Sequence, residues 1–376
     1  MVNQRFEFPA PRTPLLIVGA SARAAAFSAV RAGITPWTAD LFADRDLVRV
    51  SIDCRRVADY PRGLLEIARQ GPAGPWLYTG ALENAPRLVQ QLSRCRPLWG
   101  NPAAVLRRVR CPLTVARVLD EHGIACPKVL DGSDVPTPGR WLRKPKAGAS
   151  GCGIDFADQR SAGSAASYLQ EYLEGDAHSA VYVGTADRTT LLGVTRQLVG
   201  ESWLHAGPFR YCGSIGPRTL STALAGALDR LGQVLTTACE LRGLFGVDFI
   251  LRDDSPWPLE INPRYTASVE VLEWATGRAA LSDCAGSSPR REVLGKAIYY
   301  APSPLRLPVA GPWEDCLQRA FDPWHVPDYA DIPLPGEPFD TGQPVLTFFA
   351  AAATVEECRG NLQRIAGDLD RRLFSR

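Results

Sequence analysis

The sequence predicts an α/β protein that begins with a parallel sheet and continues with antiparallel strands. The apolar run 14–20, the alanine-rich run 21–32 and the strand-like run 34–40 follow one another in β-α-β order. Such a unit builds a parallel sheet with helices on its faces. Residues 246–251 and 258–264 are two further apolar runs separated by turn-forming residues, which is the pattern of an antiparallel hairpin.

Composition and charge narrow the class of protein. The chain has 376 residues, of which 45% are hydrophobic and 22% are charged, as in ordinary globular proteins. The formal net charge is +2 and no basic run of five residues occurs, so we expect no nucleic-acid partner. No apolar run approaches the roughly 20 residues that span a bilayer, and the N-terminus lacks the pattern of a signal peptide. Ten cysteines without a CxxC pair fit reduced thiols. We therefore expect a cytoplasmic protein without a membrane partner.

The first strand leads into a turn, residues 19–23, whose backbone N–H groups lie at the start of a helix and favour an anion. Asp40 follows about 20 residues later, where dinucleotide-binding folds place a ribose-binding acid. Ser21 and Ala24, however, replace two glycines of the G-x-G-x-x-G fingerprint. The pattern favours a Rossmann-like domain without a dinucleotide, and a nicotinamide-dependent oxidoreductase remains the alternative.

The middle of the chain alternates strands and helices after a boundary at residues 97–102. Before this boundary we expect a strand at 76–80, which Glu83 and Asn84 follow. After it we expect helix 114–121, strands 141–145, 168–175, 179–183 and 191–198, and helix 221–242. The last helix carries a stripe of leucines at helical spacing, Leu224, Leu228, Leu231, Leu235 and Leu241. Such a stripe predicts that the helix packs against a sheet.

A lysine and a loop of small residues form the first chemical motif. Lys144 ends a predicted strand, and the loop 147–153 follows it. Small residues let the backbone approach phosphate oxygens, and a nearby lysine neutralises part of their charge. The loop is not a Walker A loop, because no G-K-[ST] closes it and the lysine precedes the glycines. A plain flexible glycine loop is the alternative.

The predicted hairpin carries the second motif. Asp248 lies in its first strand, and Glu260 and Asn262 lie two residues apart in its second strand, so that those two side chains share a face. Carboxylate and amide oxygens suit a magnesium ion that carries the phosphates of a nucleotide. Arg264 continues this face and offers a forked donor to a phosphate oxygen. The alternative, a solvated acidic face, fits poorly because apolar residues flank Glu260.

The C-terminal part of the chain has a different composition. Strands at 296–301 and 344–350 flank a proline-rich passage, and residues 354–374 form a terminal helix with Thr354 as its N-cap. We expect a small β-rich domain that braces the site or a subunit contact, which leaves a homodimer open.

Taken together, the motifs resemble the ATP-grasp ligases. The resemblance rests on Lys144-Pro145, the loop 147–153, the run 170–175 and the set Asp248, Glu260, Asn262, Arg264, in the order and spacing of that family. It covers residues 100 to 285. It implies three parts: a Rossmann-like domain at 1–100, an ATP-grasp module of two α+β subdomains at 101–288 with a hinge near 170–175, and a C-terminal domain at 289–376.

The resemblance also implies roles for single residues, with ATP and Mg2+ as cofactors. Lys144 would contact the α- and β-phosphates, under a loop that includes Gly148, Ser150, Gly151 and Gly153. The hinge residues Gln170, Glu171, Tyr172 and Leu173 would read adenine through their backbone. Asp248, Glu260 and Asn262 would bind magnesium, Arg264 would steady an acyl-phosphate and Arg196 would face the γ-phosphate. The chain departs from the family pattern at two places, where Arg110 replaces an early lysine and Asp176 stands in for the ribose-binding acid.

The implied reaction joins a small-molecule carboxylate to a small-molecule amine through an acyl-phosphate. Residues 260–270 and 209–217 resemble ligases of one-carbon cofactor biosynthesis, such as the tyramine–glutamate ligase of methanofuran synthesis and proteins of tetrahydromethanopterin pathways. Arg210, Tyr211 and Ser214 are the candidates for the substrate pocket, because a polar cluster between glycines suits a binding loop. A structural turn with a buried tyrosine is the alternative there, and a non-catalytic nucleotide-binding scaffold is a further alternative for the whole chain.

Overall fold

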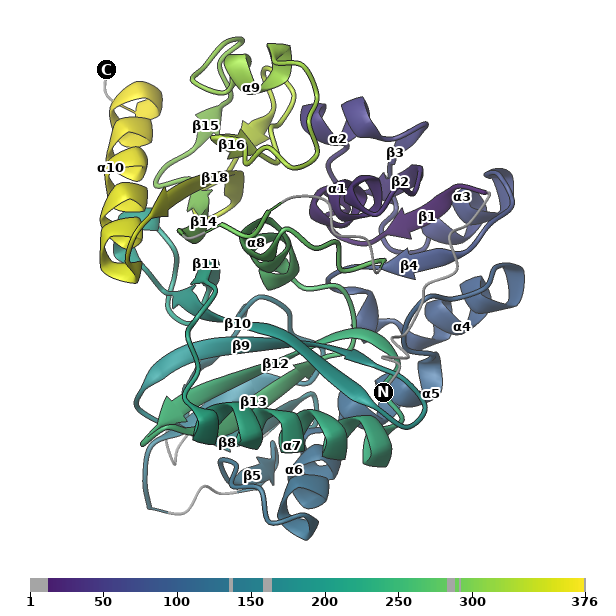
Figure 1. Ribbon diagram of the computed structural model, residues 1–376, viewed down its shortest axis with the longest axis vertical. Helices are drawn as coiled ribbons and strands as arrows, with labels where there is room; N and C mark the ends of the chain where they lie inside the picture. The colour runs from purple at the N-terminus through teal and green to yellow at the C-terminus, as the bar shows by residue number, and fades with distance from the viewer. Residues whose placement is uncertain (1–12, 135–137, 158–163, 283–287, 291, 375–376) are drawn as a thin grey trace.

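The computed structural model describes residues 13–134, 138–157, 164–282, 288–290 and 292–374. It confirms the predicted α/β class, with a parallel sheet near the N-terminus and antiparallel sheets after it (Figure 1). Within these residues no helix is both long and apolar enough to cross a bilayer.

The parallel sheet is built from four short strands in the order β3-β2-β1-β4. The strands are β1 (Leu15–Val18), β2 (Pro36–Asp40), β3 (Cys54–Arg56) and β4 (Trp76–Tyr78). The helices between and after them are α1 (Arg23–Arg31), α2 (Arg45–Val50), α3 (Leu64–Gln70), the 3-10 turn η1 (Leu82–Asn84) and α4 (Pro86–Cys95). All residues of β1 are buried, which agrees with an apolar strand covered by helices on both faces.

A small antiparallel sheet follows, in the order β5-β8-β6-β7. Its strands are β5 (Val129–Asp131), β6 (Trp141–Pro145), β7 (Asp155–Ala157) and β8 (Ser167–Glu171). Two helices, α5 (Ala103–Val109) and α6 (Pro112–Glu121), lead into it from the parallel sheet. This sheet carries Lys144 and the glycine loop at the end of β6.

An eight-stranded antiparallel sheet forms the centre of the molecule, in the order β13-β12-β9-β10-β11-β14-β18-β16. The strands are β9 (Asp176–Gly184), β10 (Thr189–Val199), β11 (Tyr211–Gly216), β12 (Gly243–Arg252), β13 (Ser255–Asn262), β14 (Val293–Tyr300), β16 (Tyr329–Ala330) and β18 (Pro344–Ala352). The strands β15 (Leu305–Arg306) and β17 (Pro338–Phe339) pair separately. The strands after residue 289 thus extend the central sheet.

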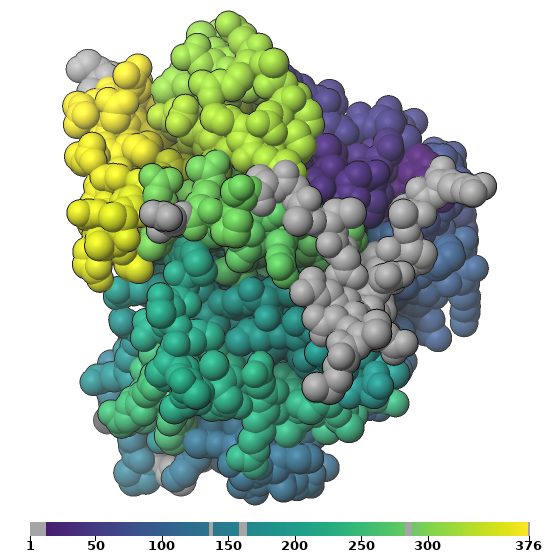
Figure 2. Space-filling view, in the orientation of Figure 1, coloured from purple at the N-terminus to yellow at the C-terminus, as the bar shows by residue number. Residues whose placement is uncertain are grey.

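The central sheet has helices on two faces. The remaining helices are η2 (Ser202–Leu204), α7 (Thr222–Cys239), α8 (Ala267–Thr276), α9 (Glu314–Gln318) and α10 (Val355–Phe374). The predicted leucine stripe of α7 is buried against one face of the sheet, and Leu241 joins it from just beyond the helix. α8 lies between the other face and α1 (Figure 1). Figure 2 shows α10 and the segment before it, in yellow and light green, stacked on the teal central segment beside the purple N-terminal helices.

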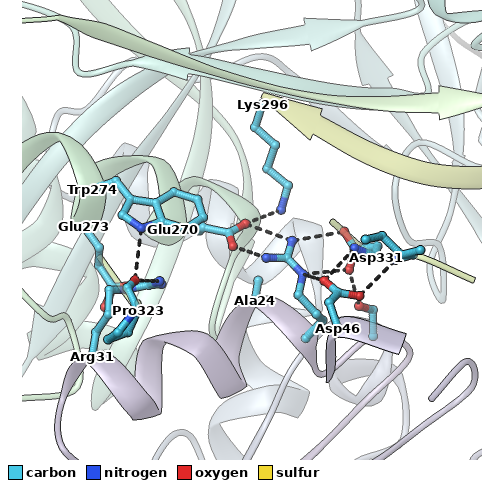
Figure 3. Close-up of polar contacts among 12 residues, drawn as sticks. Ala24, Arg31, Asp46, Glu270, Glu273, Trp274, Lys296, Pro323 and Asp331 are labelled. Atoms are coloured by element: carbon cyan, nitrogen blue, oxygen red, sulfur yellow. Dashed lines mark hydrogen bonds and ion pairs between the residues drawn. The ribbon is translucent and has the colours of Figure 1, made fainter. Parts of the chain in front are cut away.

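Buried charges join α1 and α8 to the C-terminal strands. Arg23 of α1 donates to Glu270 of α8 and, at 3.0 Å, to Asp331, while Lys296 of β14 donates to Glu270 at 2.8 Å. Asp46 of α2 accepts the backbone N–H of Asp331 at 3.0 Å. Figure 3 shows Glu270, Asp331 and Asp46 around one guanidinium, with Lys296 reaching Glu270 from above. The cluster fixes the N-terminal helices against the central sheet.

We expect Glu270→Gln to destabilise the fold by about 3 kcal/mol, because it leaves the buried Arg23 and Lys296 without their common anion. Burial favours the neutral acid, yet Arg23 and Lys296 outweigh it and hold the pKa of Glu270 below its usual range. The charged group therefore stabilises the fold above the ordinary pKa of a glutamate, and this contribution is lost as the pH falls towards the lowered pKa. Urea unfolding at neutral pH measures the effect. Glu292→Gln, at an exposed site, is the control and changes the stability by less than about 0.5 kcal/mol.

Candidate active site

The predicted hairpin places Asp248 and Glu260 opposite each other. β12 and β13 pair in a register that sets Asp248 against Glu260, and the turn between them holds Asp253 and Asp254 at φ of 46° and 58°. Asn262 donates from Nδ2 to Asp248 Oδ2 at 2.9 Å. The two carboxylates and the amide thus share one face of the central sheet, as their spacing in the sequence suggested.

This group suits a divalent cation. Burial, and after it the charge of Glu260, raises the pKa of Asp248 to about 6. Gln197 of β10 donates to the same carboxylate at 3.0 Å. A nearby cation stabilises the ionised form of a carboxylate that lies so close to a second acid. Hard oxygen donors also match the ligand preference of Mg2+. Within the described ranges no group of three or more His, Cys, Asp or Glu residues fits a metal, so this mixed set of acids and an amide is the candidate.

Arg110, at the end of α5, lies where the sequence lacks the expected lysine. Its guanidinium donates to Glu260 through Nη1 and to the carbonyl of Gly148 through Nη2 at 3.0 Å. Nη2 also donates to Asn84 Oδ1 at 3.0 Å. Arg110 therefore connects a candidate metal ligand to the glycine loop. Its positive charge lies between these two groups, which is where the resemblance to the ATP-grasp ligases would place the phosphates of ATP.

Lys144 is buried between the small sheet and the central sheet, with 7% of its surface exposed. Its ammonium donates to Gln170 Oε1 at 2.9 Å, and Gln170 Nε2 donates to the carbonyl of Leu259 at 3.1 Å. Burial lowers the pKa of Lys144, while Glu260 and Asp248 raise it and so offset part of that effect. Gln170 thus links the lysine to the backbone of β13 next to Glu260.

The glycine loop leaves β6 and contacts the residues before β11. Ser150, Gly151 and Gly153 have φ of 52°, 74° and 73°, so the loop depends on left-handed backbone. The backbone N–H of Tyr211 donates to the carbonyl of Ser150 at 3.2 Å. A Cβ atom on Gly151 would lie 1.8 Å from the carbonyl oxygen of Phe209. The small residues therefore permit close docking of the loop.

We expect Gly151→Ala to prevent this docking and Gly153→Ala to preserve it. Both substitutions place alanine at positive φ, but a Cβ atom on Gly153 would meet only Pro145, at 3.6 Å. Gly151→Ala should therefore reduce kcat/KM for ATP about tenfold more than Gly153→Ala does. Equal effects of the two variants would show that backbone strain, rather than the approach of the loop to Phe209, limits activity.

Arg264 leaves β13 and is held by several acceptors. Its Nε donates to Glu83 Oε1 at 2.9 Å, and its Nη2 donates to Asn262 Oδ1 at 3.1 Å. Its Nη1 donates to the carbonyl of Tyr265 at 3.1 Å. The guanidinium is therefore fixed beside the candidate metal ligands.

Arg196 does not belong to this group. β10, β9 and β12 pair so that Thr195, Ser179 and Asp248 share one face of the sheet. Arg196 points to the opposite face, where α7 packs, and donates to Asp176 at 3.0 Å. The assignments of Arg196 to the γ-phosphate and of Asp176 to ribose are therefore not supported by their positions, and Gln197 takes the place beside Asp248.

The predicted hinge connects the small sheet to β9. The N–H groups of Glu171 and Tyr172 donate to the carbonyls of Lys128 and Arg140, at 2.9 Å and 2.8 Å, and so are already used. The ring of Tyr172 lies against Phe156, with 5.2 Å between centroids, and Leu173 is buried. Any reading of adenine by these two residues would depend on their carbonyl groups.

Two of the three substrate candidates, Tyr211 and Ser214, lie near the start of α8. Tyr211 and Ser214 share a hydrogen bond of 2.8 Å between their hydroxyls, and Ser214 lies 3.3 Å from the hydroxyl of Ser268. The guanidinium of Arg210 lies over the ring of Tyr300, 5.5 Å from its centroid. The hydroxyl groups are thus arranged as a chain across the sheet, on the face that carries Asp248.

The acid proposed for a dinucleotide has another role. Asp40 accepts the backbone N–H groups of Ala22, Phe42 and Ala43 at 2.8, 3.1 and 2.8 Å. Its oxygens therefore hold the turn between β2 and α2 and the start of α1. This observation argues against a ribose contact and against the nicotinamide alternative.

Sequence reasoning did not assign a role to Glu83 and Asn84, although both contact the site. They form the tip of η1, which directly follows β4. Residues just after a parallel strand gather at the carboxyl edge of the sheet, where ligands commonly bind. Their position just after a predicted parallel strand was the feature of the sequence that could have assigned them to the site.

Comparison with known proteins finds a family model that matches the central part of the chain. Residues 113–268 match the family model described as "ATP-grasp domain". An uncharacterised protein of Methanocaldococcus jannaschii is 24% identical over 131 residues, which are 35% of this chain and 30% of that protein. The chain thus spans about a third of the length of that relative.

Solved structures share the fold over nearly the whole chain. An L-amino acid ligase from Bacillus licheniformis is 15% identical, with a TM-score of 0.69 over 96% of this chain and 98% of that chain. The biotin carboxylase domain of 2-oxoglutarate carboxylase from Hydrogenobacter thermophilus, in complex with MgADP, is 14% identical, with a TM-score of 0.68 over 95% of this chain and 90% of that chain. The N5-carboxyaminoimidazole ribonucleotide synthetase from Thermotoga maritima is 12% identical, with a TM-score of 0.65 over 94% of this chain and 98% of that chain.

Proposed function

We propose that this protein is an ATP- and Mg2+-dependent ligase that joins a carboxylate to an amine, a proposal supported by the match of residues 113–268 to the ATP-grasp domain model and by the shared fold of an L-amino acid ligase. One observation supports the proposal above the others. Lys144 of the small sheet donates to Gln170, and Gln170 donates to the carbonyl of Leu259, the residue before Glu260, so that the buried ammonium adjoins the acidic hairpin of the central sheet. A magnesium ion bound to the acids on one side, and the lysine on the other, would then hold the triphosphate of ATP.

The proposal divides the chain as the sequence suggested, into an N-terminal domain at 1–100, the ligase module at 101–288 and a C-terminal domain at 289–376. Asp248, Glu260 and Asn262 would hold the magnesium, which lowers the cost of the charge that develops during phosphoryl transfer. Lys144 and Arg110 would bind the phosphates under the glycine loop. Arg264, fixed by Glu83 and Asn262, would stabilise the acyl-phosphate through an oriented guanidinium.

The proposed reaction needs no covalent bond to the protein. A carboxylate oxygen of the acid attacks the γ-phosphorus, the bond to the β–γ bridging oxygen breaks, and ADP leaves. The lone pair of an uncharged amine then attacks the acyl carbon. The carbon–oxygen bond to phosphate breaks, phosphate leaves with the electron pair, and the nitrogen releases a proton. The chain supplies positioning and charge, which are the main contributions in such transfers.

We further propose small-molecule substrates and a cytoplasmic location. Amino acids are the first acids and amines to test, because the Bacillus licheniformis protein with the same fold is named as an L-amino acid ligase. Biosynthesis of a one-carbon cofactor of the methanofuran or tetrahydromethanopterin type is the second candidate, since residues 260–270 and 209–217 resemble ligases of that class. A homodimer remains part of the proposal.

Release of ADP and phosphate from MgATP tests this function. The protein is mixed with panels of amino acids, tyramine and other primary amines, singly and in pairs. A ligase releases phosphate only when an acid and an amine are both present, and an equal amount of amide forms. Binding of ATP without turnover in any pair would favour the scaffold, and a change in nicotinamide fluorescence on mixing would favour the oxidoreductase.

A further inference from the structure

The tip of η1 brings the N-terminal domain into the candidate active site. Asn84 donates to the carbonyl of Gly148 at 3.2 Å and accepts from Arg110 at 3.0 Å. Its neighbour Glu83 contacts Arg264. Ala81, the residue before η1, has φ of 74°, a left-handed conformation that is costly for a residue with a side chain and marks a constrained turn. This short segment therefore contacts both the glycine loop and Arg264 of the hairpin.

The two carboxylate oxygens of Glu83 are used unequally. Oε1 accepts both contacts from Arg264, from Nε at 2.9 Å and from Nη2 at 2.8 Å. Oε2 is buried and has no hydrogen-bond partner in the described part of the chain. Burial opposes ionisation, but Arg264 outweighs it and holds the pKa of Glu83 below its usual range. Glu83 is therefore a carboxylate with one oxygen that lacks a donor, and such an oxygen is costly to bury.

The hydroxyl of Tyr60 is unpaired in the same region. It is buried without a hydrogen-bond partner among the residues that the structure describes. After burial, the charge of Glu83 is the strongest influence on it, and both raise the pKa of Tyr60, so that the phenol stays protonated at neutral pH. Arg264 also acts on this hydroxyl. The ring of Tyr60 packs against the core cluster that includes Leu82, the residue before Glu83, so both unpaired oxygens belong to the same part of the N-terminal domain.

We propose that Glu83 Oε2, helped by the Tyr60 hydroxyl, is the binding site for the protonated amine of the second substrate. Both oxygens accept hydrogen bonds, and an ammonium group supplies several donors together with a charge opposite to that of Glu83. A substrate carboxylate or phosphate would be repelled from Oε2. An amine at this position lies beside Arg264, the residue proposed to hold the acyl-phosphate that the amine attacks.

This inference rests on the proposed function and deepens it, because it assigns the amine to the side of the active site formed by the N-terminal domain. The bound ammonium must give one proton to water before its lone pair attacks the acyl carbon, and the nitrogen gives a second proton to water as the carbon–oxygen bond to phosphate breaks. Glu83 therefore selects a basic amine and positions it.

Binding of amines to the MgADP complex tests the proposal without knowledge of the acid. Melting temperatures are measured for the full chain with MgADP and with amino acids, tyramine, putrescine and methylammonium added one at a time. At least one of these amines should stabilise the wild-type complex. Glu83→Gln keeps an oxygen for Arg264 and replaces Oε2 by a donor, so the apparent affinity for that amine should fall about tenfold or more. MgADP should stabilise both proteins equally.

Tyr60→Phe is a second variant, which removes only the hydroxyl. It should lower the apparent affinity for the same amine severalfold. If Glu83→Gln does not fold, this variant decides the matter. Stabilisation by no amine in the set, or by an amine equally well in all variants, would overturn the assignment of Glu83. Failure of MgADP to stabilise the wild type would instead overturn the proposed function.

Hydroxylamine as the second substrate distinguishes two roles of Glu83, the binding of a cationic amine and the positioning of Arg264. It is largely uncharged at neutral pH and does not need an ammonium site. With an acid found in the phosphate-release assay, Glu83→Gln should reduce kcat/KM for the cationic amine about tenfold more than it reduces kcat/KM for hydroxylamine, because only the cationic amine needs Oε2. Loss of both activities together would show that Glu83 acts only by positioning Arg264.

Discussion

Glu260→Gln should reduce ligase turnover by at least about 1,000-fold and leave the fold intact. The substitution removes one negative oxygen from the proposed magnesium site, opposite Asp248 on the paired strand. Magnesium would then bind weakly, and the charge that develops at the γ-phosphate would lose its main stabilisation. The affinity for ATP should also lose most of its dependence on Mg2+, which titration calorimetry with and without the metal measures even before the substrates are known.

The stability of this variant should change by less than about 1 kcal/mol, because two effects oppose each other. Arg110 loses its charged partner, while Asp248 is relieved of the like charge that contributes to its raised pKa. Glu121→Gln, at an exposed position of α6, is the matched control and should change neither turnover nor stability. Near-normal turnover in Glu260→Gln would contradict the metal assignment.

Lys144→Met should weaken the binding of ATP about 100-fold and preserve the fold. Methionine keeps much of the length and volume of lysine but removes the ammonium, which lies between the two sheets and donates to Gln170. A cation buried there has a lowered pKa and is costly to the free protein, so its removal should not destabilise strongly. The expected loss is therefore one of nucleotide affinity, measured as the Kd of MgATP.

Lys146→Met is the control for this change. Lys146 lies two residues further along the same segment, is partly exposed and pairs with Asp131 at 3.0 Å. If only Lys144 contacts the phosphates, Lys146→Met should change the Kd of MgATP by less than threefold, because a surface ion pair contributes little. A loss of affinity in Lys146→Met as large as in Lys144→Met would show that general positive charge, not the buried ammonium, attracts the nucleotide.

The fold was largely predictable because its signals are local. The β-α-β order near the N-terminus, the leucine stripe of α7 and the hairpin of β12 and β13 all follow from periodicity and turn residues within short windows. The arrangement of the C-terminal strands was not predictable in this way, because it depends on pairing between distant parts of the chain. β14, β18 and β16 extend the central sheet by pairing beyond β11, and nothing in their own residues specifies that neighbour.

The candidate site was predictable only where its residues lie on one hairpin. Asp248, Glu260 and Asn262 were correctly brought together because the spacing within two paired strands sets their face. Arg196 and Gln197 are adjacent and point to opposite faces, and the choice between them depends on the register of β10 against β9, which the sequence does not reveal. Glu83 comes from another sheet, and its contact with Arg264 spans 181 positions of the chain.

The central claim is that Mg2+ and the phosphates of ATP bind between Lys144 and the pair formed by Asp248 and Glu260. A crystal structure with magnesium and a non-hydrolysable ATP analogue tests it most directly. We expect the metal to be coordinated by oxygens of Asp248, Glu260 and Asn262, with the Lys144 ammonium in hydrogen-bond contact with a phosphate. A nucleotide bound elsewhere, or a metal that these oxygens do not coordinate, would contradict the proposed ligase.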